Sequence, residues 1–454
     1  MVAGNAVRKR ANEPDARDPV GGYQGGAAPL PPDTENMDVK TLVESKARAA
    51  REAARTLALC SSRTKNDALH QMARGLEEKT AAIIEANRAD LERTRAAGAT
   101  RAFLDRLTLT DARIESMAAG LREIAALPDP VGETIDAWRR PNGLEISRVR
   151  VPLGVIGFIY ESRPNVTVDA AGLCVKSGNA VLLRGGKEAI ESNTLIAAVL
   201  AKAMEKTGAP SDAIQFVDRT DREAVGAMLV QDRFLDLIIP RGGEEFVRWV
   251  AENSRVPVLK HDKGLVHVFV DAAADLDMAT TIVLNAKTHR PSVCNALETL
   301  LVDRAVADRF LPVVTTRLHA AGVELRGCPE TLARVPGLRA ATEADWDEEY
   351  LDLVLAIRVV DGLDAALEHI RRHSTGVAET IVTNDLGHAR RFTREVDAGA
   401  VLVNASTRLV DGNQFGLGAE MGISTSRVHA RGPVGVRELT TTKFIVHGDG
   451  QVRD

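Results

Sequence analysis

The chain has 454 residues, enough for two to four domains and for a large core that needs no disulfide or metal. Lys and Arg number 58 against 63 Asp and Glu, and the net charge of −5 excludes a strongly basic nucleic-acid-binding protein. No run of about 18 uncharged apolar residues occurs, so no membrane span is expected. Together with the charge and the scattered cysteines, this predicts a cytoplasmic protein with no membrane or nucleic-acid partner.

The N-terminal third is predicted to be a tail followed by helices. Residues 1–37 are rich in Gly and Pro and poor in apolar residues, which predicts a disordered tail. Apolar residues at helical spacing over 42–58 predict an amphipathic helix, and Ala-rich helices continue to about Leu127. Residues 144–151 then alternate between apolar and polar, as in an exposed strand or hairpin arm.

The rest of the chain alternates apolar, β-branched runs with helical stretches. The first set of expected elements comprises strands at 155–160, 180–183, 214–217 and 235–239 and a helix at 188–207. The second set comprises strands at 266–270, 297–302, 353–360, 380–383 and 401–404 and helices at 276–286 and 305–320. Nearly continuous apolar strands with helices between them predict two α/β lobes with parallel sheets. A Gly-rich loop at 416–422 and a strand at 441–447 end the chain.

The four cysteines are scattered without any CxxC pair, which indicates free thiols and no zinc site. Cys174 lies in an apolar helical segment and is interpreted as a small core residue. Cys60 ends the first helix and Cys328 lies between Gly and Pro, so both are interpreted as structural.

Cys294 has a different setting, in an expected loop between a helix and a strand. Lys287, His289 and Arg290 are close in sequence. Nearby positive charge lowers the pKa of a thiol towards the reactive thiolate. The local sequence leaves a catalytic role and a chance position equally open.

Two glycine pairs follow expected strands and could bring backbone close to phosphates. They lie in the turns Arg184-Gly185-Gly186-Lys187 and Arg241-Gly242-Gly243. No GxGxxG motif follows either strand. Because glycine also serves any tight turn, a purely structural role stays the alternative.

Five longer segments carry a more specific signal. They are LPDPVG (127–132), VPLGVIGFIYESRPNV (151–166), NAKTHRPSVCN (285–295), FGLGAEMGIST (415–425) and HARGPVG (429–435). Taken in this order, they resemble the aldehyde dehydrogenase superfamily from about residue 38 to 446. Within it, the chain is similar to the branch that makes L-glutamate 5-semialdehyde from L-glutamyl 5-phosphate in proline biosynthesis.

The resemblance implies an aldehyde dehydrogenase-like α/β fold with a Rossmann-like cofactor domain, an α/β catalytic domain and a β oligomerisation arm. The expected NADP-binding domain comprises 38–133 and 151–260 with part of 405–430. The expected catalytic domain comprises 261–404, and the arm comprises 134–150 and 431–454. In the arm, the strand at 134–150 would join the strand near 440–447, and a homodimer or homotetramer is implied.

The resemblance also implies roles for individual residues. Cys294 falls at the catalytic cysteine of the family, whose thiolate attacks an acyl carbon. The turn with Arg184 and Lys187 falls where the family contacts the adenosine ribose. A cation there suits a 2′-phosphate, so NADPH is the expected cofactor. Glu349 resembles the glutamate that holds the nicotinamide ribose in the family. The aromatic-Gly-Pro motif that usually follows this glutamate is missing here, so a solvated acidic turn without a cofactor role stays the alternative for Glu349.

Two departures from the family bear on the reaction. The family's water-activating Glu is missing from the aligned stretch Leu259-Lys-His-Asp-Lys-Gly264, where a Lys or His stands. An enzyme that transfers its acyl group to phosphate needs no such base. The oxyanion-hole Asn is also absent, and Glu161-Ser-Arg163 stands there, with Asn165 two residues further on. The residues expected to bind substrate or phosphate are Arg163, Asn165, Lys263, His289 and Arg290.

The resulting expectation is reduction of an acyl phosphate through a thioester on Cys294. An acylating relative that uses a CoA thioester and a catalytically silent relative stay as alternatives. Only 37 residues precede the matched region, so any glutamate 5-kinase partner is expected to be a separate protein.

Overall fold

The computed structural model describes residues 37–161, 163–260 and 263–453. All of the expected tail except Met37 lies outside these residues, so its disorder stays a prediction. Residues 38–454 form one compact unit. Among the described residues, no helix is both long enough and apolar enough to cross a membrane.

In the part of the chain that the structure describes, five helices precede the first strand. They are α1 (Val39–Leu57), α2 (Ser62–Glu78), α3 (Thr80–Ala96), α4 (Arg101–Leu107) and α5 (Asp111–Ala126). Four of them have an N-cap residue whose side chain accepts a hydrogen bond from a backbone N–H of the first turn, which stabilises the start of the helix. These N-cap residues are Asp38, Ser61, Thr100 and Thr110. The apolar faces of α1, α2 and α5 join the core around the first α/β sheet, which confirms the predicted amphipathic helix at 42–58.

The first sheet has four parallel strands in the order β5-β4-β3-β6. They are β3 (Val155–Tyr160), β4 (Ala180–Arg184), β5 (Ile214–Phe216) and β6 (Leu237–Arg241). The helices between and after them are α6 (Asn165–Lys176), α7 (Ile190–Glu205), α8 (Arg222–Leu229) and α9 (Glu244–Asn253). The predicted strands are confirmed, and Cys174 is fully buried in α6 as expected. Because β4 and β6 lie on opposite sides of β3, the strand order reverses between β3 and β6.

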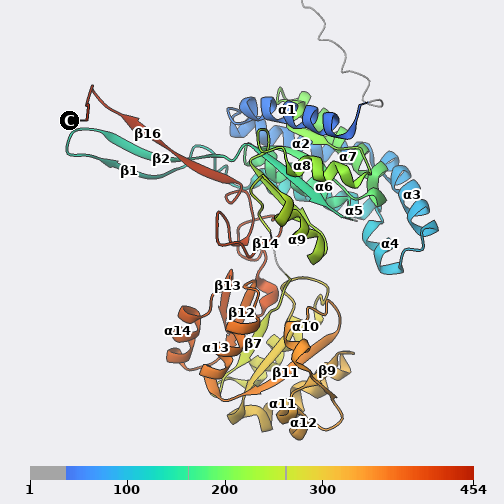
Figure 1. Ribbon diagram of the computed structural model, residues 1–454, viewed down its shortest axis with the longest axis vertical. Coiled ribbons are helices and arrows are strands. Elements are labelled where there is room, and N and C mark those ends of the chain that lie inside the picture. The colour runs from blue at the N-terminus through green and yellow to red at the C-terminus, as the bar shows by residue number, and fades with distance from the viewer. Residues whose placement is uncertain (1–36, 162, 261–262, 454) are drawn as a thin grey trace, which may run out of the picture. The chain divides into compact units, whose positions relative to one another are not determined.

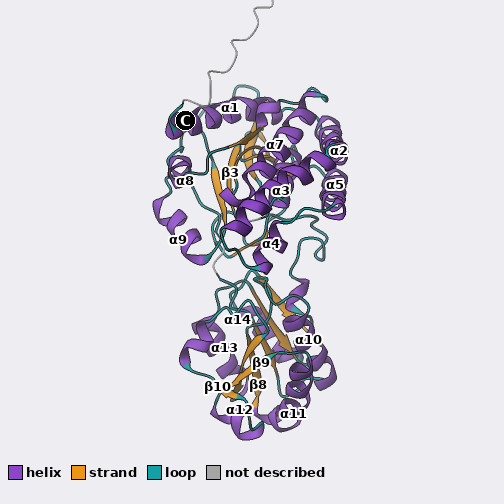
Figure 2. Ribbon diagram, turned by 90° about the vertical axis from the view of Figure 1, so that its right-hand side faces the viewer, coloured by secondary structure: helices purple, strands orange, loops and turns teal. Residues whose placement is uncertain are grey.

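The second sheet has seven parallel strands in the order β10-β9-β11-β8-β7-β12-β13. Its strands are drawn in orange in Figure 2, where β8, β9 and β10 are labelled. They are β7 (His267–Val270), β8 (Thr299–Asp303), β9 (Glu324–Gly327), β10 (Arg339–Ala340), β11 (Val354–Val360), β12 (Ala378–Val382) and β13 (Ala400–Val403). Its helices are α10 (Leu276–Thr288), α11 (Arg304–Ala320), α12 (Pro329–Arg334), α13 (Gly362–His373) and α14 (Leu386–Glu395). The five predicted strands and two predicted helices are confirmed. The sequence missed β9, β10 and α12–α14; β9 and β10 are too short and polar to form an apolar run.

A third, antiparallel sheet has the order β1-β2-β16 (Figure 1). Its strands are β1 (Thr134–Arg139), β2 (Glu145–Pro152) and β16 (Thr440–His447). The predicted pairing of the alternating segment with the last strand is confirmed, with Glu145 opposite His447. Trp138 and Phe444 meet edge to face, with ring centres 6.2 Å apart. A two-stranded pair, β14 (Ile423–Ser424) and β15 (Gly432–Pro433), precedes β16.

Candidate active site

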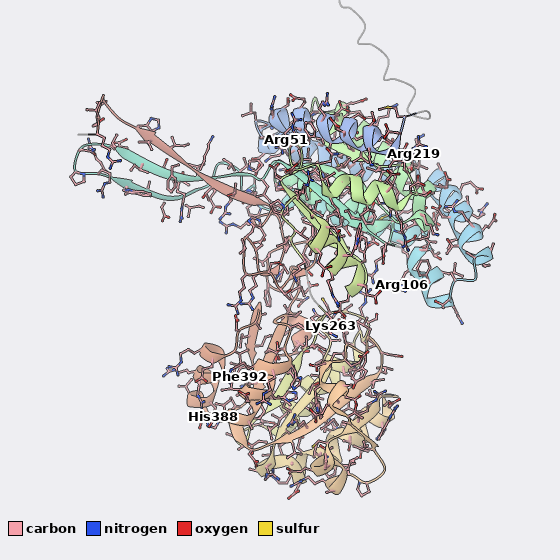
Figure 3. All side chains as sticks on the ribbon, in the orientation of Figure 1. Arg51, Arg106, Arg219, Lys263, His388 and Phe392 are labelled. Atoms are coloured by element: carbon pink, nitrogen blue, oxygen red, sulfur yellow. The ribbon has the colours of Figure 1, made fainter. Side chains whose placement is uncertain are left out.

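A cavity of about 480 Å³ lies at the carboxyl ends of β3 and β6 and beside the turn that carries Cys294. Of the expected site residues, its wall includes Arg163, Arg241, Gly242, Gly243, Lys263, Arg290, Cys294 and Glu349. Its wall also includes Glu161, from the stretch that replaces the family's oxyanion-hole Asn, and charged residues that the sequence did not single out, namely Arg106, Glu244, Arg408, Asp411 and Glu420. Figure 3 labels two residues of this wall, Arg106 on α4 and Lys263 in the segment before β7.

Cys294 lies in the turn between α10 and β8, as predicted, and is partly buried. The backbone of Gly264 packs directly against it. A Cβ at Gly264 would lie 2.0 Å from the Cys294 carbonyl oxygen, so only glycine fits there. The Gly264 N–H donates to Glu349 Oε1 at 2.8 Å. Three segments therefore meet at Cys294: its own turn, the end of the 259–264 stretch and the loop with Glu349.

The charges around Cys294 differ from those expected. Burial raises the pKa of the thiol, Arg241 lowers it, and Glu349 and Glu420 raise it further. Lys287 is one of the cations that were expected to lower this pKa. Lys287 is buried and its Nζ lies 2.7 Å from Glu298 Oε2, so its charge is compensated by that carboxylate.

Several arginines crowd the cavity wall. The pKa of Arg163 is lowered by burial and by the positive charges of Arg241, Arg106 and Arg290. The pKa of Arg408 is lowered by burial and by Arg290. Guanidinium groups that repel one another in a half-buried wall are stabilised by an anion between them. The wall therefore suits a ligand with one or more anionic groups.

Carboxylates form another part of the wall. Burial and the neighbouring Asp411 raise the pKa of Glu420 to about 7. Glu420 Oε2 accepts a hydrogen bond of 3.0 Å from the Gly412 N–H. Lys263 Nζ lies 3.7 Å from Glu244 Oε2. Glu420 lies in the Gly-rich loop and Asp411 precedes it, far in sequence from Cys294; the Gly-rich motif was the available signal for this part of the wall.

The turn after β6 has the features of a dinucleotide-binding turn. It lies where the strand order reverses between β3 and β6, the position at which open α/β sheets bind nucleotides. Gly243 is the N-cap of α9, and a Cβ added there would meet no atom within 4 Å. This space beside a helix N-terminus fits the diphosphate of a nicotinamide cofactor. Gly242 is tighter, because its Cβ would lie 2.8 Å from Phe246.

The turn after β4 lies outside the cavity wall, and its glycines face filled space. A Cβ at Gly185 would lie 2.2 Å from the Asn193 side chain, and one at Gly186 would lie 2.1 Å from the Glu188 carboxylate. Arg184 is buried and its Nη2 donates to the Thr220 carbonyl at 3.2 Å. Lys187 is exposed.

Two expected substrate ligands are also not brought to the cavity wall. The Asn165 side chain donates instead to Asp169 Oδ2 one helical turn away, at 3.1 Å. His289 is exposed, and its Nδ1 lies 3.4 Å from Arg408 Nε. His261 and Asp262, in the stretch that lacks the family's Glu, lie outside the described residues, as does Ser162.

Comparisons with known proteins agree with this architecture. A sequence profile of the aldehyde dehydrogenase family matches residues 33–328. The chain is 58% identical to the gamma-glutamyl phosphate reductase of Moorella thermoacetica and 54% identical to that of Clostridium novyi. Each match covers 92% of this chain and all of the relative.

Solved structures extend the comparison to the fold. The gamma-glutamyl phosphate reductase of Thermotoga maritima has 49% identity and a TM-score of 0.89, over 91% of this chain and 100% of that one. The fold is shared by an acetylating aldehyde dehydrogenase from Geobacillus thermoglucosidasius, with 17% identity and a TM-score of 0.65. That match covers 92% of this chain and 98% of the other. The expected aldehyde dehydrogenase-like α/β fold is confirmed. The chain belongs to the aldehyde dehydrogenase family, and within it to the gamma-glutamyl phosphate reductases.

Proposed function

We propose that this protein reduces L-glutamyl 5-phosphate to L-glutamate 5-semialdehyde with NADPH and releases inorganic phosphate, as a step in proline biosynthesis. The observation that carries the proposal is the position of Cys294 in a cavity walled by Arg163, Arg241, Arg290 and Arg408. A thiol supplies the nucleophile, and among these arginines Arg163 and Arg241 supply the charge that an acyl phosphate requires.

The reaction would proceed through an acyl group held on Cys294. The thiolate attacks the acyl carbon, and the C–O bond to phosphate breaks as the C–S bond forms. Arg241, which favours the thiolate, and the neighbouring guanidinium groups stabilise the leaving phosphate dianion. Hydride reduction of the thioester gives a thiohemiacetal, whose collapse releases the aldehyde and returns the thiolate. Cys294 is unchanged at the end of the cycle.

Membership of the aldehyde dehydrogenase family implies a nicotinamide cofactor, which supplies the hydride. The residues that would hold it are Arg241, Gly242 and Gly243 at the N-terminus of α9, with Glu349 near the reacting end. The case for NADPH over NADH rests on Lys187, whose cation would bind a 2′-phosphate. Glu188 next to it carries the opposite charge, and its carboxylate lies against Gly186.

The mixed charges of the cavity wall fit the other end of the substrate as well. A glutamyl group carries an ammonium and a carboxylate at its α-carbon. Glu420 and Asp411 offer negative charge for the ammonium, while Arg408 and Arg290 offer positive charge for the carboxylate. We assign recognition of the amino-acid head to these four residues.

The direct test is the reverse reaction, reduction of NADP⁺ by glutamate 5-semialdehyde, with wild type and Cys294→Ala side by side. The proposal predicts reduction that requires inorganic phosphate and is lost in Cys294→Ala. Reduction without phosphate would mean that water accepts the acyl group, and a requirement for CoA would indicate the acylating alternative. No reduction with NADP⁺ or NAD⁺ by the folded wild type would favour a catalytically silent relative.

A further inference from the structure

A pair of buried charges brackets the turn that carries Cys294. Lys287 lies in the last turn of α10, and Glu298 directly precedes β8. Their charged groups are 2.7 Å apart, and the two side chains are 0% and 2% exposed. This ion pair, which we call the Lys287–Glu298 clasp, therefore joins the two ends of the segment 288–297.

The backbone at both ends of this segment is held as well. The Leu297 N–H donates to the Ala286 carbonyl at 3.0 Å, and the Glu298 N–H donates to the Val266 carbonyl at 3.1 Å. The Ala356 N–H donates to the Glu298 carbonyl at 3.1 Å. Backbone hydrogen bonds and the clasp thus hold the two ends of the segment that carries Cys294 together.

Glu298 also contacts a loop that lines the cavity. Its Oε1 accepts a hydrogen bond of 3.4 Å from the Leu351 N–H. Leu351 lines the cavity and has a φ of +52°, which is uncommon for a residue with a Cβ. Glu349, two residues earlier, accepts the Gly264 N–H that packs beside Cys294. One buried carboxylate thus contacts both the Cys294 segment and the loop that presents Glu349.

Stability alone does not account for the clasp. The ring of Tyr350 covers it, with Lys287 Nζ 5.8 Å from the ring centre, and the Tyr350 hydroxyl donates to Asp345 Oδ1 at 2.7 Å. Removing two charges from water costs free energy, and replacement of a buried ion pair by packed apolar side chains is often neutral or stabilising. Apolar side chains could fill this space, but they could not link Lys287, Glu298 and the Leu351 N–H by directional contacts.

We propose that Lys287 and Glu298 are positioning residues that hold Cys294 and Glu349 in their working arrangement across the cavity. The inference rests on the proposed role of Cys294 as the reacting thiol. Neither side chain lines the cavity, so both act through the segments they hold. Loss of either should lower kcat more than it raises the KM of the semialdehyde, because a nucleophile displaced by a fraction of an ångström loses rate before it loses binding.

The test compares Glu298→Gln and Lys287→Met with a matched control, Lys65→Met. Lys65 forms a second buried ion pair, 2.7 Å from Asp129, and neither residue lines the cavity. For each variant we would measure Tm, kcat and KM in the NADP⁺-reduction assay. The rate of iodoacetamide alkylation at Cys294 would be followed by peptide mass spectrometry over a range of pH.

We expect Glu298→Gln and Lys287→Met to lower kcat about tenfold or more, with little change in KM and an altered alkylation–pH profile. Lys65→Met should lower Tm by a comparable amount and leave kcat and the profile unchanged. The double variant Lys287→Met/Glu298→Leu should regain Tm without regaining kcat, and it also carries the test if a single variant fails to fold.

The proposal is overturned if the clasp variants lose only Tm, as the control does, or if the double variant regains kcat. The alkylation measurement does not depend on the reaction. If the wild type fails to reduce NADP⁺, the proposed function fails, while the alkylation profiles still decide whether the clasp positions Cys294.

Discussion

The two glycine-pair turns of the first sheet look alike in sequence and share a backbone conformation. Gly186 is an N-cap with φ −60° and ψ 152°, and Gly243 is an N-cap with φ −63° and ψ 159°. Their surroundings differ. The space beside Gly186 is filled by Glu188, whereas the space beside Gly243 is open and faces the cavity with Cys294.

This difference shows that a strand-Gly-Gly-helix turn does not by itself make a phosphate site. Its function depends on what other parts of the chain place against it. At the β4 turn, Asn193 and Glu188 fill the space beside the glycines. At the β6 turn, the reversal of strand order leaves a crevice, into which Arg241 also brings its charge.

The largest difference between the two turns is expected in kcat and in the alkylation of Cys294, when Arg241→Met is compared with Arg184→Met. Arg241 favours the Cys294 thiolate and lines the cavity, so its loss should lower kcat about 100-fold. Without this cation the thiol pKa rises further, so the alkylation–pH curve of Cys294 should move to higher pH. Arg184→Met, which loses a contact with the Thr220 carbonyl, should leave that curve in place. Equal shifts in the two variants would contradict the distinction between the turns.

An intermediate difference, in the KM for NADP⁺, is expected between Gly243→Ala and Gly186→Ala. A Cβ at residue 243 meets no protein atom, so the variant should keep the wild-type Tm. The same Cβ occupies the space assigned to the cofactor diphosphate, and the KM for NADP⁺ should rise about tenfold. In Gly186→Ala the nearest atoms to the new Cβ belong to the Glu188 carboxylate, and the variant should change this KM less because the turn lies outside the cavity wall. Initial rates against NADP⁺ concentration measure both, and an unchanged KM in Gly243→Ala would place the diphosphate elsewhere.

Lys187→Glu should give the smallest effect, because the side chain is exposed and an exposed ion pair contributes about 0.2–1 kcal/mol. We expect the ratio of kcat/KM for NADP⁺ to that for NAD⁺ to fall a few-fold, while Glu188→Gln shifts it the other way. Parallel assays with the two cofactors give the ratio. No change in either variant would remove the β4 turn from cofactor selection.

Sequence alone predicted the framework well, because the central strands are continuous apolar runs and the arm alternates with a period of two. Local patterns left the roles of Cys294 and of the β6 turn open; the family resemblance suggested them, and the structure places both in the wall of one cavity. Sequence alone missed Arg106, Arg408 and Glu420, which come from segments far apart in the chain and share no local motif. The compensation of Lys287 by Glu298 was equally hidden, since charges close in sequence to Cys294 were expected to act on it directly.

The central claim, an acyl group carried on Cys294 and released to phosphate, is tested most directly by a single-turnover experiment. The protein is mixed with NADP⁺ and glutamate 5-semialdehyde without phosphate, and NADPH and intact protein mass are measured in rapidly quenched samples. The account predicts a burst of one NADPH per site and a mass gain of one glutamyl group on Cys294. In Cys294→Ala it predicts neither the burst nor the mass gain. In the wild type it predicts that turnover continues once phosphate is added. Continuous turnover of the wild type without phosphate, or an equal burst from Cys294→Ala, would contradict it.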